Sequence, residues 1–159
     1  MSDFFSYKPA AAPPPPVPSA AAGAGSQPAI LADLSGDEWE QFISFAARRR
    51  YPAGAVIVQA GEADRALCFI ASGQVDLNGP GSESATRGEG EVFGLLSFLD
   101  GAASAVTATV SAGAPAELLR LTPEALQQLA AWQPRIAMAL LRDLGALVAS
   151  RLRRLQPGD

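Results

Sequence analysis

The sequence predicts a mainly β domain with flanking helices, and three features of its patterning indicate this fold. Short runs of β-forming residues separated by glycines fill the chain from about residue 51 to residue 121. A helical pattern precedes these runs, and a longer helical pattern follows them up to residue 155. Many short strands with glycine turns are typical of a sandwich, a barrel or a roll, so we expect the helices to flank a closed β structure.

The N-terminal segment differs in composition from everything that follows it. Residues 1–30 consist largely of Pro, Ala, Gly and Ser, including the run PPPP, and offer few large apolar groups to offset the entropy of ordering. We therefore expect a disordered tail, followed by one domain in residues 31–159. Phe4, Phe5 and Tyr7 interrupt the tail. They belong either to a merely solvated segment or to a short docking motif for another protein, because aromatic side chains supply much of the contact energy in small interfaces.

The first helix is predicted from its start signal. Ser35 followed three residues later by Glu38 fits a capping box, in which each side chain bonds the other residue's backbone N–H. Trp39, Phe42 and Ile43 then recur at helical spacing and predict a buried face.

The strand region contains the runs AVIVQ, ALCFIA, GQVDL, VTATV and AELLRL. Residues 80–90 (PGSESATRGEG) separate two of these runs, and we expect a long polar connector there. Asp64 and Arg65, in the turn GEADRA, are expected at a solvated hairpin tip. Cys68 has Leu67 and Phe69 as neighbours, so we expect it to be a small core residue and not a nucleophile.

Two helices should end the chain. Thr122 is a good N-cap, with Pro123 as the first helical residue. Gln133-Pro134 should end this helix, and a second helix should run from Pro134 to Leu155. The apolar stripe of this last helix is wider than one small domain requires. It packs either on the β structure alone or also against a second copy of the chain. We expect a homo-oligomer, with an interface formed by Leu140, Leu141, Leu144, Leu147, Val148 and Leu152.

Composition excludes several functional classes. The chain has 159 residues, no histidine and one cysteine, which excludes a Ser-His-Asp triad, a Cys-His nucleophile and zinc sites of the His/Cys kind. The net charge of −4 argues against general attraction to nucleic acid or to an anionic membrane. A single cysteine fits a reducing cytoplasm. We therefore expect a cytoplasmic protein that is not an enzyme and that binds no metal, no nucleic acid and no membrane.

The run YPAGAVIVQAGEADRALCFIASGQVDL resembles the first strands of a cyclic-nucleotide-binding domain of the bacterial Crp/Fnr type, with Gly54, Gly61, Asp64 and Gly73 at its recurring positions. GEVFGLLSFLDG resembles the phosphate-binding cassette of that family, and the final helix pair resembles its last two helices. The resemblance implies an eight-stranded antiparallel β-roll, similar to a double-stranded jelly roll, with one N-terminal helix and two C-terminal helices.

The resemblance also implies a ligand site, from which this sequence departs. In the family, a glutamate after Phe-Gly accepts a hydrogen bond from the ribose 2′-hydroxyl, and an arginine before the Ser/Thr-Ala pair holds the cyclic phosphate. Leu95 and Val106 stand at these two positions. Losing both anchors should cost about 3–6 kcal/mol of binding free energy. We therefore expect a degenerate pocket without a bound cofactor, formed by Phe93, Gly94, Leu95, Leu96, Val106, Thr107 and Ala108.

Two functional hypotheses follow. The first is a non-catalytic regulatory or assembly module that has lost ordinary cAMP and cGMP binding and acts through protein–protein association. The second is a sensor of a cyclic nucleotide or another nucleotide that signals through a separate partner. Crp/Fnr regulators continue beyond the long helix into a DNA-binding helix-turn-helix, whereas this sequence ends at Asp159. We therefore expect its output to pass through association with another protein.

Overall fold

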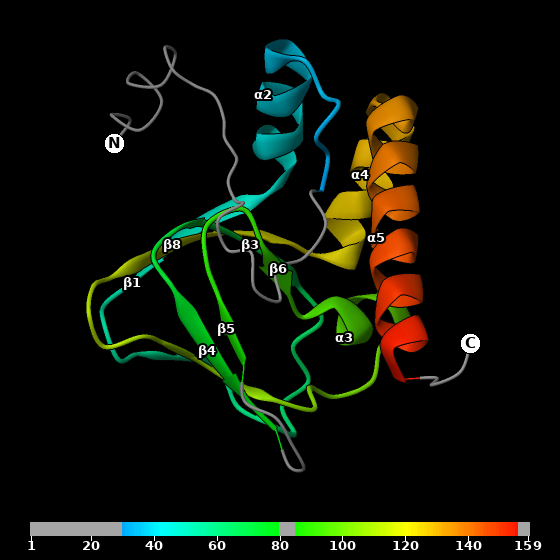
Figure 1. Ribbon diagram of the computed structural model, residues 1–159. Helices are drawn as coiled ribbons and strands as arrows, with labels where there is room; N and C mark the ends of the chain where they lie inside the picture. Colours follow the sequence, from blue (N-terminus) through cyan, green and yellow to red (C-terminus); the bar gives the residue numbers. More distant parts are fainter. Residues whose placement is uncertain (1–29, 80–84, 156–159) are drawn as a thin grey trace.

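A computed structural model describes residues 30–79 and 85–155, and it shows a β-roll with its larger helices gathered on one side (Figure 1). The strands are β1 (Ala47–Tyr51), β2 (Val56–Val58), β3 (Leu67–Ser72), β4 (Val75–Asn78), β5 (Ala85–Arg87), β6 (Val92–Phe93), β7 (Thr107–Val110) and β8 (Ala116–Leu121). The helices are α2 (Gly36–Phe45), α3 (Leu95–Asp100), α4 (Pro123–Trp132) and α5 (Pro134–Leu155). Phe4, Phe5, Tyr7 and nearly all of the predicted tail lie outside the described residues.

The strands form two four-stranded antiparallel sheets, in the orders β1-β8-β3-β6 and β2-β7-β4-β5. In the first sheet β8 is paired on both sides, since Arg120 lies opposite Ala47 of β1 and opposite Cys68 of β3. In the second sheet β4 and β7 are central, and β5 is an edge strand. The predicted eight-stranded antiparallel roll, with one N-terminal and two C-terminal helices, is confirmed.

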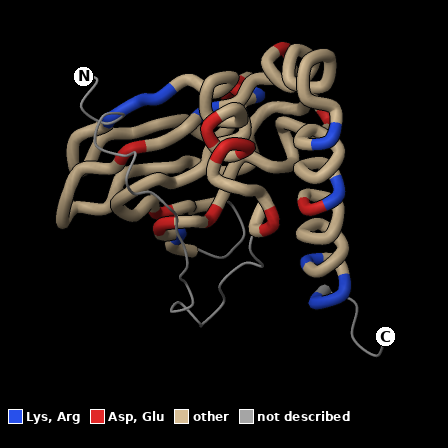
Figure 2. Tube along the Cα trace, turned by 90° about the horizontal axis from the view of Figure 1, so that it is seen from above, with Lys and Arg blue, Asp and Glu red and all other residues tan. Residues whose placement is uncertain are grey.

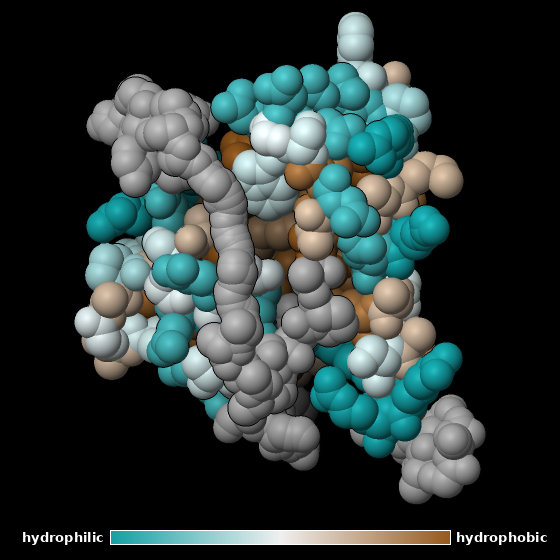
Figure 3. All heavy atoms as spheres, turned by 45° about the horizontal axis from the view of Figure 1, so that its top comes forward, coloured by the Kyte–Doolittle hydropathy of each residue, from teal (hydrophilic) through white to brown (hydrophobic). Residues whose placement is uncertain are grey.

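Alternating side chains of the first sheet divide the core into two clusters. Leu119 and Leu121 of β8 pack towards the helices, in an apolar layer that also holds Phe42 and Phe69. Leu118 of β8 instead enters a second cluster inside the roll, with Val58, Cys68, Ile70, Val75, Phe93 and Ala108. One face of the molecule shows hydrophobic residues in its middle, surrounded by hydrophilic ones (Figure 3). We call the first cluster the helical layer and the second the inner cluster.

The helix start signals are confirmed. Both hydrogen bonds of the capping box are present, from Ser35 N to Glu38 Oε1 and from Glu38 N to Ser35 Oγ. The Phe42 ring of α2 packs edge-on against the Phe69 ring of β3, with their centroids 5.1 Å apart. This contact packs α2 against the first sheet. Thr122 Oγ1 accepts a hydrogen bond from Ala125 N at the start of α4.

The structure corrects part of the predicted oligomer interface on α5. Leu140, Leu144 and Leu147 have at most 1% of their surface exposed, because they pack into the protomer's own helical layer. They are therefore not available to a second copy. Leu141 and Leu152 are 44% and 51% exposed, and Val148 is half-buried against the helical layer.

The prediction of a polar connector over residues 80–90 is also partly wrong. Residues 85–87 form β5, whose backbone pairs with β4 so that Ala85 lies opposite Leu77 and Arg87 opposite Val75. A three-residue strand with the sequence ATR has too little apolar pattern to be recognised. Its position is set by pairing with β4 instead.

Candidate functional site

The cassette predicted from the sequence begins at a glycine that the fold requires. Gly94 has φ of +83° and connects β6 to α3. A Cβ at this position would lie 2.7 Å from the carbonyl oxygen of Ala66, which is closer than van der Waals contact allows. Both the left-handed conformation and the close backbone approach exclude a larger residue here.

Side chains on the two sides of Gly94 enter different clusters. Phe93 is buried in the inner cluster, whereas Leu95 is 2% exposed and packs into the helical layer. Leu96 is 56% exposed. At the position where the family's glutamate is expected, the chain thus carries a core leucine.

Residues 104–107, which lead from the cassette into β7, are held by hydrogen bonds to the turn before β3. Gly61 N donates to the carbonyl oxygen of Ser104 over 2.8 Å, and Ser104 N donates to the carbonyl oxygen of Glu62 over 2.9 Å. Thr107 Oγ1 accepts a hydrogen bond from Ala60 N over 2.9 Å, so its hydroxyl oxygen is already engaged.

The two apolar positions in this segment are also fixed by packing. Val106 is half-buried, and its Cγ1 atom lies close to Gly79. Ala108 is fully buried in the inner cluster. The structure thus places an aliphatic side chain at the position that the resemblance assigns to the phosphate-binding arginine.

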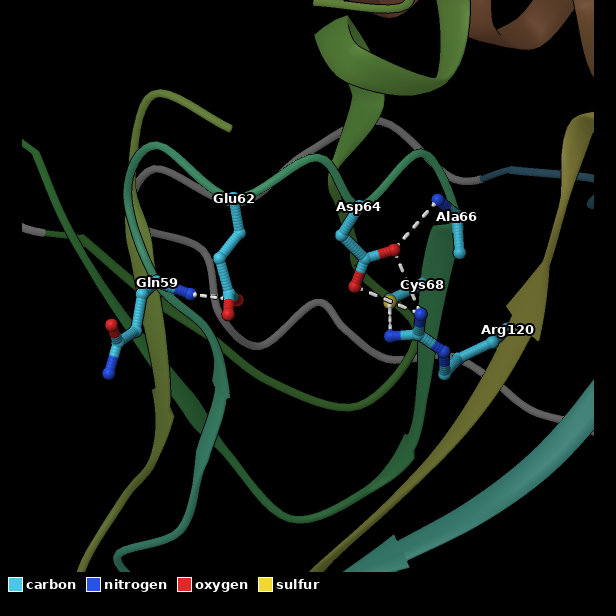
Figure 4. Close-up of polar contacts among 6 residues, drawn as sticks. All are labelled: Gln59, Glu62, Asp64, Ala66, Cys68 and Arg120. Atoms are coloured by element: carbon cyan, nitrogen blue, oxygen red, sulfur yellow. Dashed lines mark hydrogen bonds and ion pairs between the residues drawn. The ribbon is translucent and has the colours of Figure 1, made fainter. Parts of the chain in front are cut away.

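A charged pair inside the roll was not predicted. Arg120 Nη2 lies 2.9 Å from both carboxylate oxygens of Asp64, and Asp64 Oδ1 also accepts a hydrogen bond from Ala66 N (Figure 4). The side chains of Arg120 and Asp64 are only 19% and 25% exposed. The expectation that Asp64 lies at a solvated hairpin tip is therefore wrong, because its carboxylate turns inward to pair with the guanidinium. A basic residue in the apolar strand sequence AELLRL was the signal for an internal partner.

Cys68 lies beside this pair. Arg120 Nη1 is 3.6 Å from its Sγ, and the two residues face each other across β3 and β8. Burial raises the pKa of the Cys68 thiol from 9.0 to about 12, despite the opposing effect of the Arg120 charge. The thiol therefore stays protonated at neutral pH and is a core group, as predicted.

Within residues 30–79 and 85–155, no three His, Cys, Asp or Glu side chains are grouped as metal ligands would be. None of the helices in that part of the chain combines the length and the apolar character that crossing a bilayer requires.

Comparison with known proteins agrees with the geometry. The sequence profile of the cyclic nucleotide-binding domain matches residues 48–131. The chain is 35% identical over 130 residues to the cyclic AMP receptor protein of Thermus thermophilus, covering 78% of this chain and 57% of that protein. It is 31% identical over 127 residues to glutaminase 2 of Bradyrhizobium diazoefficiens, covering 79% of this chain but only 20% of that protein.

A solved cyclic nucleotide-binding domain from Methylobacillus flagellatus superposes with a TM-score of 0.68 at 25% identity, covering 79% of this chain and 72% of that structure. The curated relatives are thus longer than the matched region, and the likeness concerns one domain of each. The chain belongs to the cyclic nucleotide-binding domain family.

Proposed function

We propose that this chain is a non-catalytic regulatory or assembly module of the cytoplasm that has lost ordinary cAMP and cGMP binding and acts through protein–protein association. The observation that carries the proposal is the pair of apolar side chains, Leu95 and Val106, at the two positions where the family has its ribose and phosphate anchors. A non-catalytic role is supported by the lack of histidine and by the buried, protonated thiol of Cys68.

Neighbouring side chains do not supply substitutes for the family's ribose-binding glutamate and phosphate-binding arginine. Leu95 belongs to the helical layer, so a phosphate or ribose would meet aliphatic carbon where the family offers a carboxylate. The Nη2 atom of Arg120 is already bonded to both carboxylate oxygens of Asp64, so this guanidinium is engaged within the protein. Charge-assisted hydrogen bonds contribute roughly 1.5–3 kcal/mol each, so losing two lowers affinity by a factor of about 10²–10⁴.

The first prediction concerns cyclic nucleotides. Isothermal titration calorimetry with cAMP and with cGMP should show no binding tighter than about 100 μM. The cyclic AMP receptor protein of Thermus thermophilus, titrated with cAMP under the same conditions, is the control. A micromolar dissociation constant for this chain would contradict the proposal and favour the sensor hypothesis.

Association is supported by the apolar side chains that α5 leaves uncovered. Met138, Leu141 and Leu152 are 69%, 44% and 51% exposed, and together with Gly145 and Val148 they recur at alternating spacings of three and four residues. This spacing is that of a coiled-coil seam. We call these five residues the outer stripe, and we propose that a second copy of the chain packs against it.

The second candidate function is a sensor of a cyclic nucleotide or another nucleotide that signals through a separate partner. It is favoured by the backbone of the cassette, in which Gly94 makes a left-handed turn and α3 follows it directly. The name of the Thermus relative, cyclic AMP receptor protein, points the same way. The titration described above discriminates between the two functions.

A further inference from the structure

Strand β1 is an outermost strand of the first sheet, in which it pairs with β8 along all five of its residues. In the part of the chain that the structure describes, the other strands at sheet ends, β2, β5 and β6, have three residues or fewer. The sequence of β1, ARRRY, holds three of the 12 basic residues of a chain whose net charge is −4. Figure 2 shows this continuous basic run on the other side of the molecule from α5. β1 is thus the longest edge that a further strand could join, and it is strongly basic.

The hydrogen bonds of β3 fix the direction of the backbone groups in the first sheet. Ile70 N donates to the carbonyl oxygen of Glu91, and the carbonyl oxygen of Ile70 accepts from Gly90 N. Both partners precede β6, so the backbone groups of Ile70 point away from β8. Successive residues of a strand direct these groups to opposite sides, so those of Phe69 point towards β8.

The same alternation carries across β8 to β1. Phe69 lies opposite Leu119 and bonds it, so the next residue of β8, Leu118, directs its backbone groups to β1. Leu118 lies opposite Arg49, and these two residues therefore form a hydrogen-bonded pair. The N–H and C=O groups of Arg50 must then point out of the sheet.

The outward backbone groups of Arg50 are available to another chain. Among the residues that the structure describes, neither group has a hydrogen-bond partner. The edge is closed on both sides of this position. Pro52 lacks an N–H, and Ala46 N already donates to the carbonyl oxygen of Ile43. The open stretch is therefore short, and it suits a short extended segment.

Arginine side chains flank this edge on both faces of the sheet. Arg49 lies opposite Leu118 on the side of the inner cluster, and Arg50 lies opposite Glu117 on the other side. Both arginines are exposed. Within residues 30–79 and 85–155, no hydrogen bond or ion pair engages either guanidinium group, although Glu117 faces Arg50 across the strands.

These charges select the occupant of the edge. A second copy of the chain, paired edge to edge, would bring arginines against arginines. Residues 1–29 of the chain carry one acidic and one basic residue, Asp3 and Lys8, and so offer no net negative charge. An acidic segment of another protein would instead neutralise both guanidinium groups. Charged side chains also protect an edge strand from unwanted pairing, and that role alone would leave the edge without any partner.

We propose that the edge of β1 at Arg49 and Arg50 binds an extended acidic segment of another protein as an additional strand. The backbone of the segment pairs with the N–H and C=O groups of Arg50, and its carboxylates bind the two guanidinium groups. This surface gives the proposed association function a partner of defined chemistry. It is separate from the cassette and from the outer stripe of α5, so its failure would leave the cAMP titration and the dimer prediction unaffected.

The test uses a capped, fluorescent peptide of the sequence Glu-Val-Glu-Val-Glu-Val-Glu with the full chain in low-salt buffer. Fluorescence polarisation should show saturable binding, and the matched Lys-Val peptide should not bind. Arg49→Gln and Arg50→Gln should each weaken binding about tenfold, as expected for loss of a charge-assisted contact. Arg142→Gln removes an exposed arginine from α5 and should leave binding unchanged.

Two measurements on the wild-type chain separate strand addition from charge attraction alone. The same Glu-Val peptide with alternate backbone nitrogens methylated keeps its charge but loses donors, and it should bind at least about tenfold more weakly. In hydrogen exchange followed by NMR, saturating peptide should slow exchange of the Arg50 amide. The Arg49 amide, already bonded within the sheet, should be unchanged.

Several outcomes would overturn the proposal. Absence of peptide binding, or equal binding by wild type and both glutamine variants, would leave the arginines with edge protection only. Equal affinity for the plain and the methylated peptide, with unchanged exchange at Arg50, would exclude an added strand. Tighter binding of duplex DNA than of the acidic peptide would assign the basic edge to nucleic acid instead.

Discussion

At the scale of single residues, the inner cluster contains one group whose protonation is tied to folding. The Cys68 thiol is buried beside the Asp64–Arg120 pair, and burial raises its pKa from 9.0 to about 12. Between these two values the folded chain keeps the thiol proton while the unfolded chain releases it. Stability due to this group is therefore complete below pH 9 and falls as the pH rises above it.

The corresponding prediction is that the melting temperature of the wild-type chain declines between about pH 9 and pH 11 more steeply than that of Cys68→Ala. Differential scanning calorimetry across this range measures both. The alanine variant is the control for tyrosine and lysine residues, which also titrate there. In the same pH range, a thiol-specific chromogenic reagent should react with the unfolded chain and not with the folded one. Parallel declines in the two proteins would contradict the assignment.

At the scale of elements, α5 has two apolar faces with different roles. Leu140, Leu144 and Leu147 pack into the helical layer of its own domain, whereas the outer stripe is exposed except at Val148, which is half-buried and also touches that layer. Gly145 supports this division. Glycine inside a helix costs about 1 kcal/mol relative to alanine, yet a Cβ at Gly145 would meet nothing within 4 Å. Packing within one protomer therefore does not require glycine, whereas close approach of a second helix would.

We expect light scattering to report a dimer or larger species at micromolar concentration. Leu141→Glu combined with Leu152→Glu should shift the mass to that of a monomer while the circular dichroism spectrum is kept, because both side chains are exposed in the protomer. Ala146→Glu adds a charge on another exposed side of the helix and should leave the mass unchanged. Leu144→Glu should instead abolish the folded signal, since it buries a carboxylate in the helical layer. A monomeric wild type would exclude the outer stripe as a self-association surface.

The division of α5 also shows what the sequence could reveal. Local signals, such as the capping box at Ser35 and the Thr122-Pro123 helix start, were predicted correctly because they depend on neighbours in the chain. The roll was predicted from glycine spacing and a family resemblance. The two faces of α5 could not be separated, because only tertiary contacts decide which leucines turn inward. The Asp64–Arg120 pair, 56 residues apart in sequence, was missed for the same reason.

At the scale of the whole molecule, the N-terminal tail and the domain should contribute separately. If Phe4, Phe5 and Tyr7 dock on another protein, a few aromatic contacts of about 1–2 kcal/mol each give weak affinity alone, which oligomerisation of the domain would strengthen. Deleting residues 1–28, or changing these three residues to Ser, should leave the melting temperature unchanged and sharply reduce recovery of the native partner in a pull-down. Unchanged recovery in both variants would place the binding surface on the roll or on α5.

Gly94 has a further consequence for how the domain loses its structure. Its two neighbours in sequence, Phe93 and Leu95, belong to the inner cluster and to the helical layer respectively. The backbone at Gly94 also lies against Ala66, directly before β3, which contributes to both clusters. Neither cluster can come apart without displacing a residue anchored in the other. The roll and its helices therefore form one cooperative unit, and partial melting that releases α5 while keeping an intact roll is disfavoured.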